Sequence, residues 1–215
     1  KRKRERNRTL KNFLAVDTSS GYLTVLAYID GKKFVRHDPD CAMRQSALIM
    51  PAVDSLLKEA GAKLSDFGFF ACVVGAGSFT GIRIGISVVK GFCLATGKPC
   101  MPVTSFELSA YTEKDGKRLA LVNALHDAYY LSAYDGETQS IPPSYLTGDE
   151  VEKLVRNGYR PVSVERLPML STVVSPVDGL WNAVEKKCGR EDAFSEPVAL
   201  YVRKSQAELD GEKNK

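Results

Sequence analysis

Four glycines with spacings of two, four and four residues form the segment with the clearest chemical potential: Gly75, Gly77, Gly81 and Gly85. Two hydroxyl side chains, Ser78 and Thr80, lie among them. Glycines let a backbone approach a phosphate closely, and the free amides at the start of a helix can bind that phosphate. The segment is therefore either a phosphate-binding loop or a tight connection in which the glycines serve packing.

The established phosphate-binding and nucleophile motifs do not fit this segment. A Walker loop needs a lysine after its second glycine, but Ile82 follows Gly81. Thr80 stands where a dinucleotide-binding loop has its third glycine, and Ala76 stands where a nucleophile elbow has its first. We therefore interpret Ser78 as a helix cap and not as a nucleophile.

The glycines join an apolar strand to an amphipathic helix. Residues 69–74 form a continuous apolar run, which is typical of a buried strand. Apolar residues then recur at helical spacing and predict a helix over 80–96. Inside a helix each glycine costs about 1 kcal/mol relative to alanine, so Gly81 and Gly85 need a compensating role. Because they lie on one helix face, we expect that face to be open to a closely packed partner.

The other periodicities predict a mixed sheet that is parallel at its centre. Strands are predicted at 13–18, 22–29, 33–37, near 100–103, and at 119–123, 129–135 and 160–164. Helices are predicted at 44–60, with a kink or loosened turn at Pro51, and at 149–156 and 177–187. Segment 136–148 contains Pro142, Pro143 and Gly148 and is predicted to be a loop.

Composition predicts a soluble protein of a reducing compartment. The chain has 215 residues, of which 44% are hydrophobic, enough to bury a sizeable core. No uninterrupted apolar run approaches the 18 or so residues of a membrane span, and the basic N-terminus lacks the apolar stretch of a secretory signal. Five cysteines without a C-x-x-C pair are expected to be reduced thiols: Cys41, Cys72, Cys93, Cys100 and Cys188. We expect a cytoplasmic protein without membrane contact.

Positive charge is concentrated at the N-terminus. Residues 1–11 carry seven basic side chains and one acidic one, so the rest of the chain is slightly negative although the whole has a net charge of +4. The body is therefore not a basic nucleic-acid surface. The basic arm either contacts RNA phosphates or is a solvated leader.

The glycine segment resembles the signature G-P-G-S-F-T-G-L-R-I-G of the TsaB family, tRNA threonylcarbamoyladenosine biosynthesis proteins also called YeaZ. Only Ala76, for proline, and Ile82, for leucine, depart from it. The resemblance extends over most of the chain, through the segments Phe13–Ser19, Leu48–Leu57, Lys90–Pro99 and Leu200–Arg203.

This resemblance implies an α/β fold of the actin-like ATPase, or sugar-kinase-like, type. Such a fold has two small subdomains, each with a mixed sheet and flanking helices. We place the N-terminal subdomain at 13–104 and the C-terminal subdomain at 105–205. Residues 1–12 are expected to form a disordered basic leader, and residues 206–215 a charged mobile tail.

The resemblance also implies a noncatalytic partner subunit of the transferase TsaD, which forms N6-threonylcarbamoyladenosine at position 37 of tRNAs. TsaD binds a metal through an H-x-x-x-H motif, whereas this chain has only His37 and His126, far apart. We therefore expect no catalytic residue and no metal site. The implied assembly includes a TsaD heterodimer, the ATPase TsaE and a homodimer when the chain is alone. The tRNA is reached through the complex, and ATP or ADP acts only at the level of the complex.

Two sets of site residues follow from the resemblance. The helices over 44–60 and 80–96 are expected to dock against TsaD through Gln45, Ile49, Val53, Gly81, Arg83, Gly85 and Val89. Replacing Gly85 with leucine should then weaken the heterodimer more than the monomer. Residues near a nucleotide would be Asp17, Thr18, Gly75, Gly77, Ser78 and Thr80. Alternatively, Asp17 caps its own turn at the end of a strand.

The alternative function is a small-molecule kinase or ATPase of the actin-like superfamily, which would bind phosphates with Asp17, Thr18 and the loop 75–81. A second phosphate loop is missing from the pattern, which argues against it. Two departures from the family pattern also bear on the site. Gln45-Ser46-Ala47 replaces His-Ser-Glu, and Asn123-Ala124-Leu125 replaces Asp-Ala-Arg.

Overall fold

A five-stranded mixed sheet organises the first lobe of the molecule in the computed structural model, which describes residues 10–112, 116–168, 173–190 and 192–203. The strand order is β3-β2-β1-β4-β5. The β1–β2 and β2–β3 pairs are antiparallel, and the β1–β4 and β4–β5 pairs are parallel. The strands are β1 (Phe13–Asp17), β2 (Leu23–Ile29), β3 (Lys32–Asp38), β4 (Phe69–Val73) and β5 (Cys100–Val103). The leader predicted at 1–12 falls largely, and the tail at 206–215 entirely, outside the described residues.

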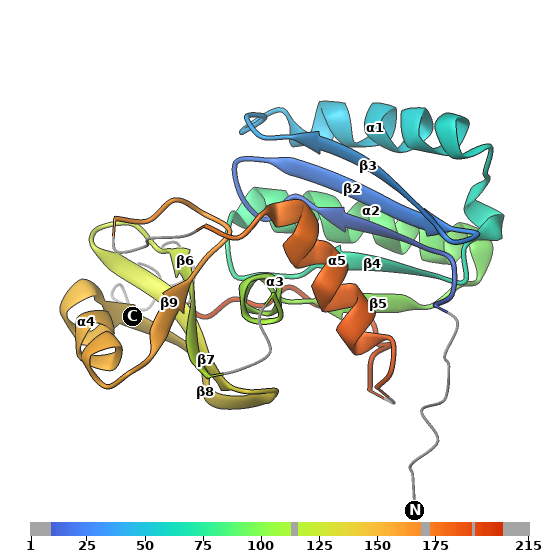
Figure 1. The fold of residues 1–215 in the computed structure, drawn as a ribbon. Coiled ribbons are helices and arrows are strands. Elements are labelled where there is room, and N and C mark those ends of the chain that lie inside the picture. Colours follow the sequence, from blue (N-terminus) through green and yellow to red (C-terminus); the bar gives the residue numbers. More distant parts are fainter. Residues whose placement is uncertain (1–9, 113–115, 169–172, 191, 204–215) are drawn as a thin grey trace, which may run out of the picture.

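Helices cover both faces of this sheet (Figure 1). Helices α1 (Gln45–Ala60) and α2 (Phe79–Thr96) lie on one face, and α5 (Pro176–Lys187) lies on the other. Side chains alternate along β1, so Leu14 and Val16 pack in the α1–α2 core while Phe13 and Ala15 pack in the core on the α5 side. Because both faces are covered, β1 and β4 are buried along their whole length, as their continuous apolar runs predicted.

The second lobe has a four-stranded sheet in the order β8-β7-β6-β9. Its strands are β6 (Lys117–Asn123), β7 (Ala128–Asp135), β8 (Thr138–Thr147) and β9 (Arg160–Val162). Only the β6–β9 pair is parallel. Helix α4 (Gly148–Arg156) places Val151 in a small core with the inner side chains of β6 and β7. Between the lobes, the short helix α3 (Ser105–Ala110) is buried along its whole length, and a single 3-10 turn, η1, spans Leu64–Asp66.

The loop predicted at 136–148 is wrong, because most of this segment is strand β8. Pro142 and Pro143 are tolerated for two reasons. β8 is an edge strand, so one side of its backbone needs no strand partner. The pairing with β7 is also irregular here, shifting between Leu131 and Ala133, so that the prolines fall at a bulge.

The C-terminal part of the chain returns to the first lobe. Helix α5 contacts β1, β2 and β5, and it also packs on α3. Farther along, the Ser195 amide donates to the Cys100 carbonyl (3.1 Å), and the Leu200 amide donates to the Val74 carbonyl (2.7 Å). The subdomain boundaries at 104 and 105 stay a prediction. In the described residues, α5 and the segment from Ser195 to Leu200 pack on the first lobe, together with β1.

Within the described residues, α2 is the one helix long and apolar enough to cross a membrane, with a mean hydropathy of 1.3 over 18 residues. Its composition has a structural reason in this fold. Its buried residues all contribute to one face that packs against the sheet: Gly81, Ile82, Gly85, Ile86, Val89 and Phe92.

Candidate functional site

The glycine loop is packed tightly against its own chain. Ser78 caps α2, since its Oγ accepts a hydrogen bond from the Gly81 amide (3.2 Å), which confirms the predicted cap. Gly75 and Gly77 have φ values of 124° and 148°, which L side chains rarely adopt. A Cβ at Gly75 would lie 2.5 Å from the Leu200 carbonyl oxygen. One at Gly77 would overlap the carbonyl oxygen of Ser19, which accepts from the Ser78 amide (2.7 Å). The loop glycines are therefore required by packing.

The glycine face of α2 is also filled from within. A Cβ at Gly81 would overlap the Thr18 carbonyl oxygen, and one at Gly85 would lie 2.6 Å from Thr18 Oγ1. Thr18 Oγ1 itself donates to the Gly81 carbonyl (2.7 Å). The prediction that this face is open to a partner helix is therefore wrong, because Thr18, the residue directly after β1, occupies it. Gly85→Leu is therefore no longer expected to weaken mainly the heterodimer, since a leucine at this position would disrupt the monomer directly.

Asp17 accepts hydrogen bonds from residues of the turn that follows β1. It is fully buried, and its Oδ1 accepts from the Ser19 amide (2.8 Å) and the Ser19 hydroxyl (2.7 Å). Its Oδ2 accepts from the Tyr22 hydroxyl (2.7 Å). The interpretation of Asp17 as the cap of its own turn is thus confirmed. Burial raises the pKa of Asp17 above its usual 3.8, with the hydrogen bonds from Ser19 and Tyr22 opposing the rise.

The raised pKa of Asp17 gives an expected pH dependence. A carboxyl group that holds its proton more tightly in the folded state than in the unfolded state loses stabilising effect as the pH rises through its folded pKa. We therefore expect the free energy of unfolding of the wild type to fall relative to that of Asp17→Asn as the pH rises from 3.8 through the raised pKa. Above that range the difference should be constant. Urea denaturation at a series of pH values measures this, and parallel curves for the two proteins would contradict it.

Several residues predicted to contact a partner lie inside the monomer. Ile49, Val53 and Val89 are at most 1% exposed and belong to the core between the helices and the sheet. Gln45 is also buried, and its Nε2 donates to the Ser20 carbonyl (2.9 Å). Nearly all of the surface of these side chains is covered within the monomer, although Ile49 also lines the groove described next. Arg83 is exposed, in agreement with a surface role.

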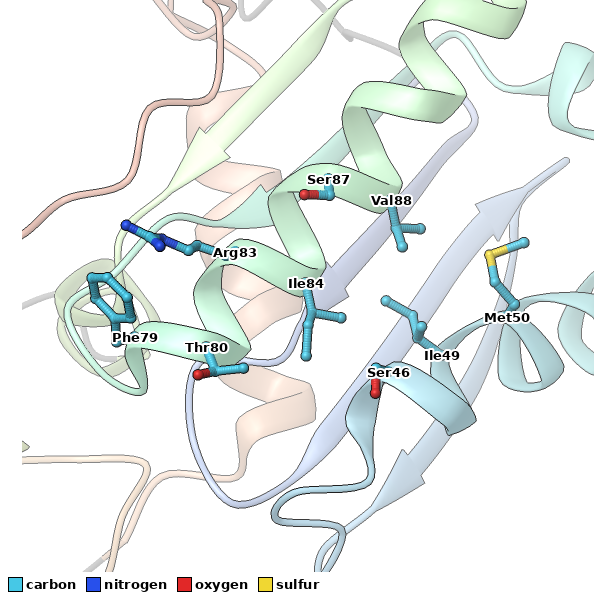
Figure 2. A pocket seen from close by; sticks show the side chains of 9 residues that line it. All are labelled: Ser46, Ile49, Met50, Phe79, Thr80, Arg83, Ile84, Ser87 and Val88. Atoms are coloured by element: carbon cyan, nitrogen blue, oxygen red, sulfur yellow. The ribbon is translucent and has the colours of Figure 1, made fainter.

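The exposed sides of α1 and α2 form a groove of about 480 Å³, here called the α1–α2 groove (Figure 2). Ile84 and Val88 of α2 point toward α1, where Met50 lies at the surface. Arg83 extends from α2 on the side away from α1, with its guanidinium 3.7 Å from the Phe79 ring centre and its Nε donating to the Tyr201 hydroxyl (2.8 Å). The groove is lined by Ser46, Ile49, Met50, Phe79, Thr80, Arg83, Ile84, Ser87 and Val88.

A second cavity of about 450 Å³, here called the interlobe cleft, lies where the two lobes meet. Among the residues predicted near a nucleotide, Gly77, Ser78 and Thr80 line it, whereas Asp17, Thr18 and Gly75 do not. The second lobe contributes Asn123 and Glu165. Sequence reasoning missed Glu165, because it follows β9 in a segment without any motif.

No metal-binding constellation is found in the described part of the chain, where His, Cys, Asp and Glu nowhere gather in groups of three that could hold an ion. His37 lies beside Thr24, with 2.9 Å between Nδ1 and Oγ1. The five cysteines are free thiols, and the closest described approach is 3.9 Å between the Sγ atoms of Cys72 and Cys100.

Two small α/β lobes with mixed sheets, a glycine loop leading into a core helix and a cleft between the lobes define an actin-like fold. Solved structures agree. "YeaZ from Pseudomonas aeruginosa" superposes with a TM-score of 0.71 at 23% identity, covering 89% of this chain and all of that one. A second Pseudomonas aeruginosa structure, of a protein "with similarity to peptidase YEAZ", has a TM-score of 0.73 at 23% identity and covers 90% of this chain and all of its own.

Sequence comparison identifies the family within this fold. The model "TsaD: tRNA N6-adenosine threonylcarbamoyltransferase" matches residues 38–208. The chain is 29% identical over 170 residues to the tRNA threonylcarbamoyladenosine biosynthesis protein TsaB of Escherichia coli, covering 79% of this chain and 72% of that protein. It is 29% identical over 125 residues to TsaB of Bacillus subtilis, covering 57% and 53%. The chain therefore belongs to the TsaB (YeaZ) family.

Proposed function

We propose that this protein is a noncatalytic subunit in the biosynthesis of N6-threonylcarbamoyladenosine at position 37 of tRNAs, and that it acts by docking to TsaD through the α1–α2 groove. Its family assigns it to this biosynthesis. The observation that carries the docking is the groove itself, in which apolar side chains of two helices remain uncovered in the monomer.

The composition of the groove favours a protein partner. Met50 is 43% and Phe79 is 44% exposed, although both are large and apolar. Ile84 and Val88 lie between them, and Arg83, Ser46 and Ser87 supply a polar rim. An exposed apolar patch with a polar rim is typical of an interaction surface, in which the apolar centre becomes dry on binding.

The noncatalytic role is supported by the contacts of the turn after β1 and of the glycine loop. Asp17 is engaged by three hydrogen bonds within its own turn. The glycines of the loop are required by contacts with Ser19, Thr18 and Leu200. Contacts within the chain therefore account for these residue types without a bound substrate. The alternative of a kinase or ATPase relied on the same residues to bind phosphates, and this argument for it is lost.

The rest of the proposed assembly follows the same reasoning. We propose that the isolated chain binds no nucleotide and that ATP or ADP acts at the level of the complex, with the ATPase TsaE as a further partner. Without TsaD the same groove forms a homodimer, because related surfaces of paralogous chains are close to self-complementary. The tRNA is reached through the complex. The protein works in the cytoplasm without membrane contact.

The direct test is to mix the purified chain with its cognate TsaD and to measure mass by light scattering after size exclusion, with and without ATP. We expect a one-to-one heterodimer to replace the homodimer. A chain that elutes alone under every condition would overturn the docking, and ATP turnover by the isolated chain would then be measured.

A further inference from the structure

One wall of the interlobe cleft has features that favour an anion. The 18-residue helix α2 begins there, and its N-terminus carries partial positive charge from the aligned peptide dipoles. Gly77, Ser78 and Thr80 line the same wall. Backbone amides and hydroxyls at a helix N-terminus commonly surround a phosphate or a carboxylate.

The opposite wall supplies a carboxylate from the chain itself. Glu165 Oε1 accepts a hydrogen bond from the Ser20 hydroxyl of the first lobe (2.6 Å). Its Oε2 accepts a hydrogen bond from the backbone amide of Asn123 at the end of β6 (2.9 Å). One side chain thus connects two segments that lie 145 and 42 residues away in the sequence.

The position of Glu165 is fixed by a buried neighbour. Ser163 is fully buried, and its Oγ donates to the Leu121 carbonyl (2.7 Å) while accepting from the Glu165 amide (3.0 Å). Ser163 therefore holds the backbone of Glu165 against β6. Because the backbone of Glu165 is held in this way, less conformational entropy is lost when its side chain bonds to Ser20.

The charge of the cleft is negative on the second-lobe side. No lysine or arginine lines the cleft, and no cation among the described residues forms an ion pair with Glu165. The negative charge of Glu165 also contributes, as a minor cause beside burial, to the raised pKa of Asp17. A phosphate entering this cleft would meet a fixed negative charge without any basic side chain to offset it.

We propose that Glu165 is an interlobe clamp, which joins Ser20 of the first lobe to Asn123 of the second lobe across the cleft and, by its charge, excludes phosphate-bearing ligands from the cleft. The carboxylate lines the same cleft as the start of α2, so its charge acts where the helix N-terminus would otherwise attract an anion. The clamp is a property of the chain alone and does not depend on docking to TsaD.

Two substitutions of Glu165 distinguish the effect of its hydrogen bonds from the effect of its charge. Glu165→Ala removes both, whereas Glu165→Gln removes the charge and keeps an oxygen that can accept from the Asn123 amide. The matched control is Glu152→Gln on α4, an exposed carboxylate that pairs with Arg156 away from the cleft. All variants are made in the full chain, and circular dichroism checks that they fold.

Hydrogen exchange tests the clamp. We expect the Asn123 backbone amide to exchange roughly tenfold faster in Glu165→Ala than in the wild type, equivalent to about 1.4 kcal/mol, because its hydrogen bond to the Glu165 carboxylate is lost. In Glu165→Gln and Glu152→Gln the exchange should stay close to that of the wild type. Equal exchange in the wild type and Glu165→Ala would overturn the clamp.

Calorimetry with inorganic pyrophosphate tests the exclusion. We expect Glu165→Gln to bind pyrophosphate at least roughly tenfold more tightly than the wild type or Glu152→Gln, which again corresponds to about 1.4 kcal/mol. If Glu165→Ala does not fold, Glu165→Gln decides alone. Pyrophosphate binding no tighter than in the wild type would overturn the exclusion.

Discussion

Replacing Gly81 with alanine is expected to lower the free energy of unfolding by about 2 kcal/mol, because an added methyl group in a packed site costs up to about 3 kcal/mol. The new Cβ would overlap the Thr18 carbonyl oxygen, which belongs to the backbone and cannot rotate away. Helix α2 would have to move from β1, which would strain the hydrogen bond from Thr18 Oγ1 to the Gly81 carbonyl. The gain in helix propensity, about 1 kcal/mol, offsets only part of this cost.

The matched control is Gly91→Ala in the same helix. A Cβ at Gly91 would have no atom within 4 Å, so the substitution should stabilise the protein by up to about 1 kcal/mol through helix propensity alone. Urea denaturation of the two variants and the wild type measures both effects. If Gly81→Ala were as stable as Gly91→Ala, the close contact between α2 and β1 would not exist in solution.

The glycines at 81 and 85 show how far local sequence patterns can predict contacts. Helical spacing showed that Gly81 and Gly85 share a face and that something approaches it closely. It could not show that the approaching group is Thr18, because spacing contains no information on contacts between residues 63 apart. Local signals worked where the contact is local, as for the Ser78 cap and the turn at Asp17.

Missing information on long-range contacts also explains the other differences between the sequence-based predictions and the structure. Two prolines made the segment of β8 look like a loop, since proline disrupts an interior strand, but the sequence does not reveal which strands lie at an edge. On α1 the apolar stripe was assigned to the partner, although Ile49 and Val53 form the core of the monomer. Glu165 carries no local signal, because its partner Ser20 is 145 residues away.

Met50→Glu is expected to weaken the complex with TsaD about a hundredfold or more. This substitution on the exposed face of α1 is the sharpest test of docking. Met50 lies in the α1–α2 groove and is 43% exposed. A glutamate there would have to be buried without a partner when the groove is covered, and unpaired buried charges and lost central contacts cost about 2–4 kcal/mol in interfaces. Isothermal titration of TsaD with each variant measures the loss.

The monomer should be nearly unaffected by this change, because substitutions of exposed residues usually alter stability by no more than about 0.5 kcal/mol and glutamate is a good helix former. Val198→Glu provides the control. It introduces the same charge at an apolar residue that is 70% exposed and does not line the groove. Wild-type affinity in Val198→Glu with a large loss in Met50→Glu places the contact in the groove. Equal affinity in both variants would exclude the groove as the docking surface, even if the heterodimer itself forms.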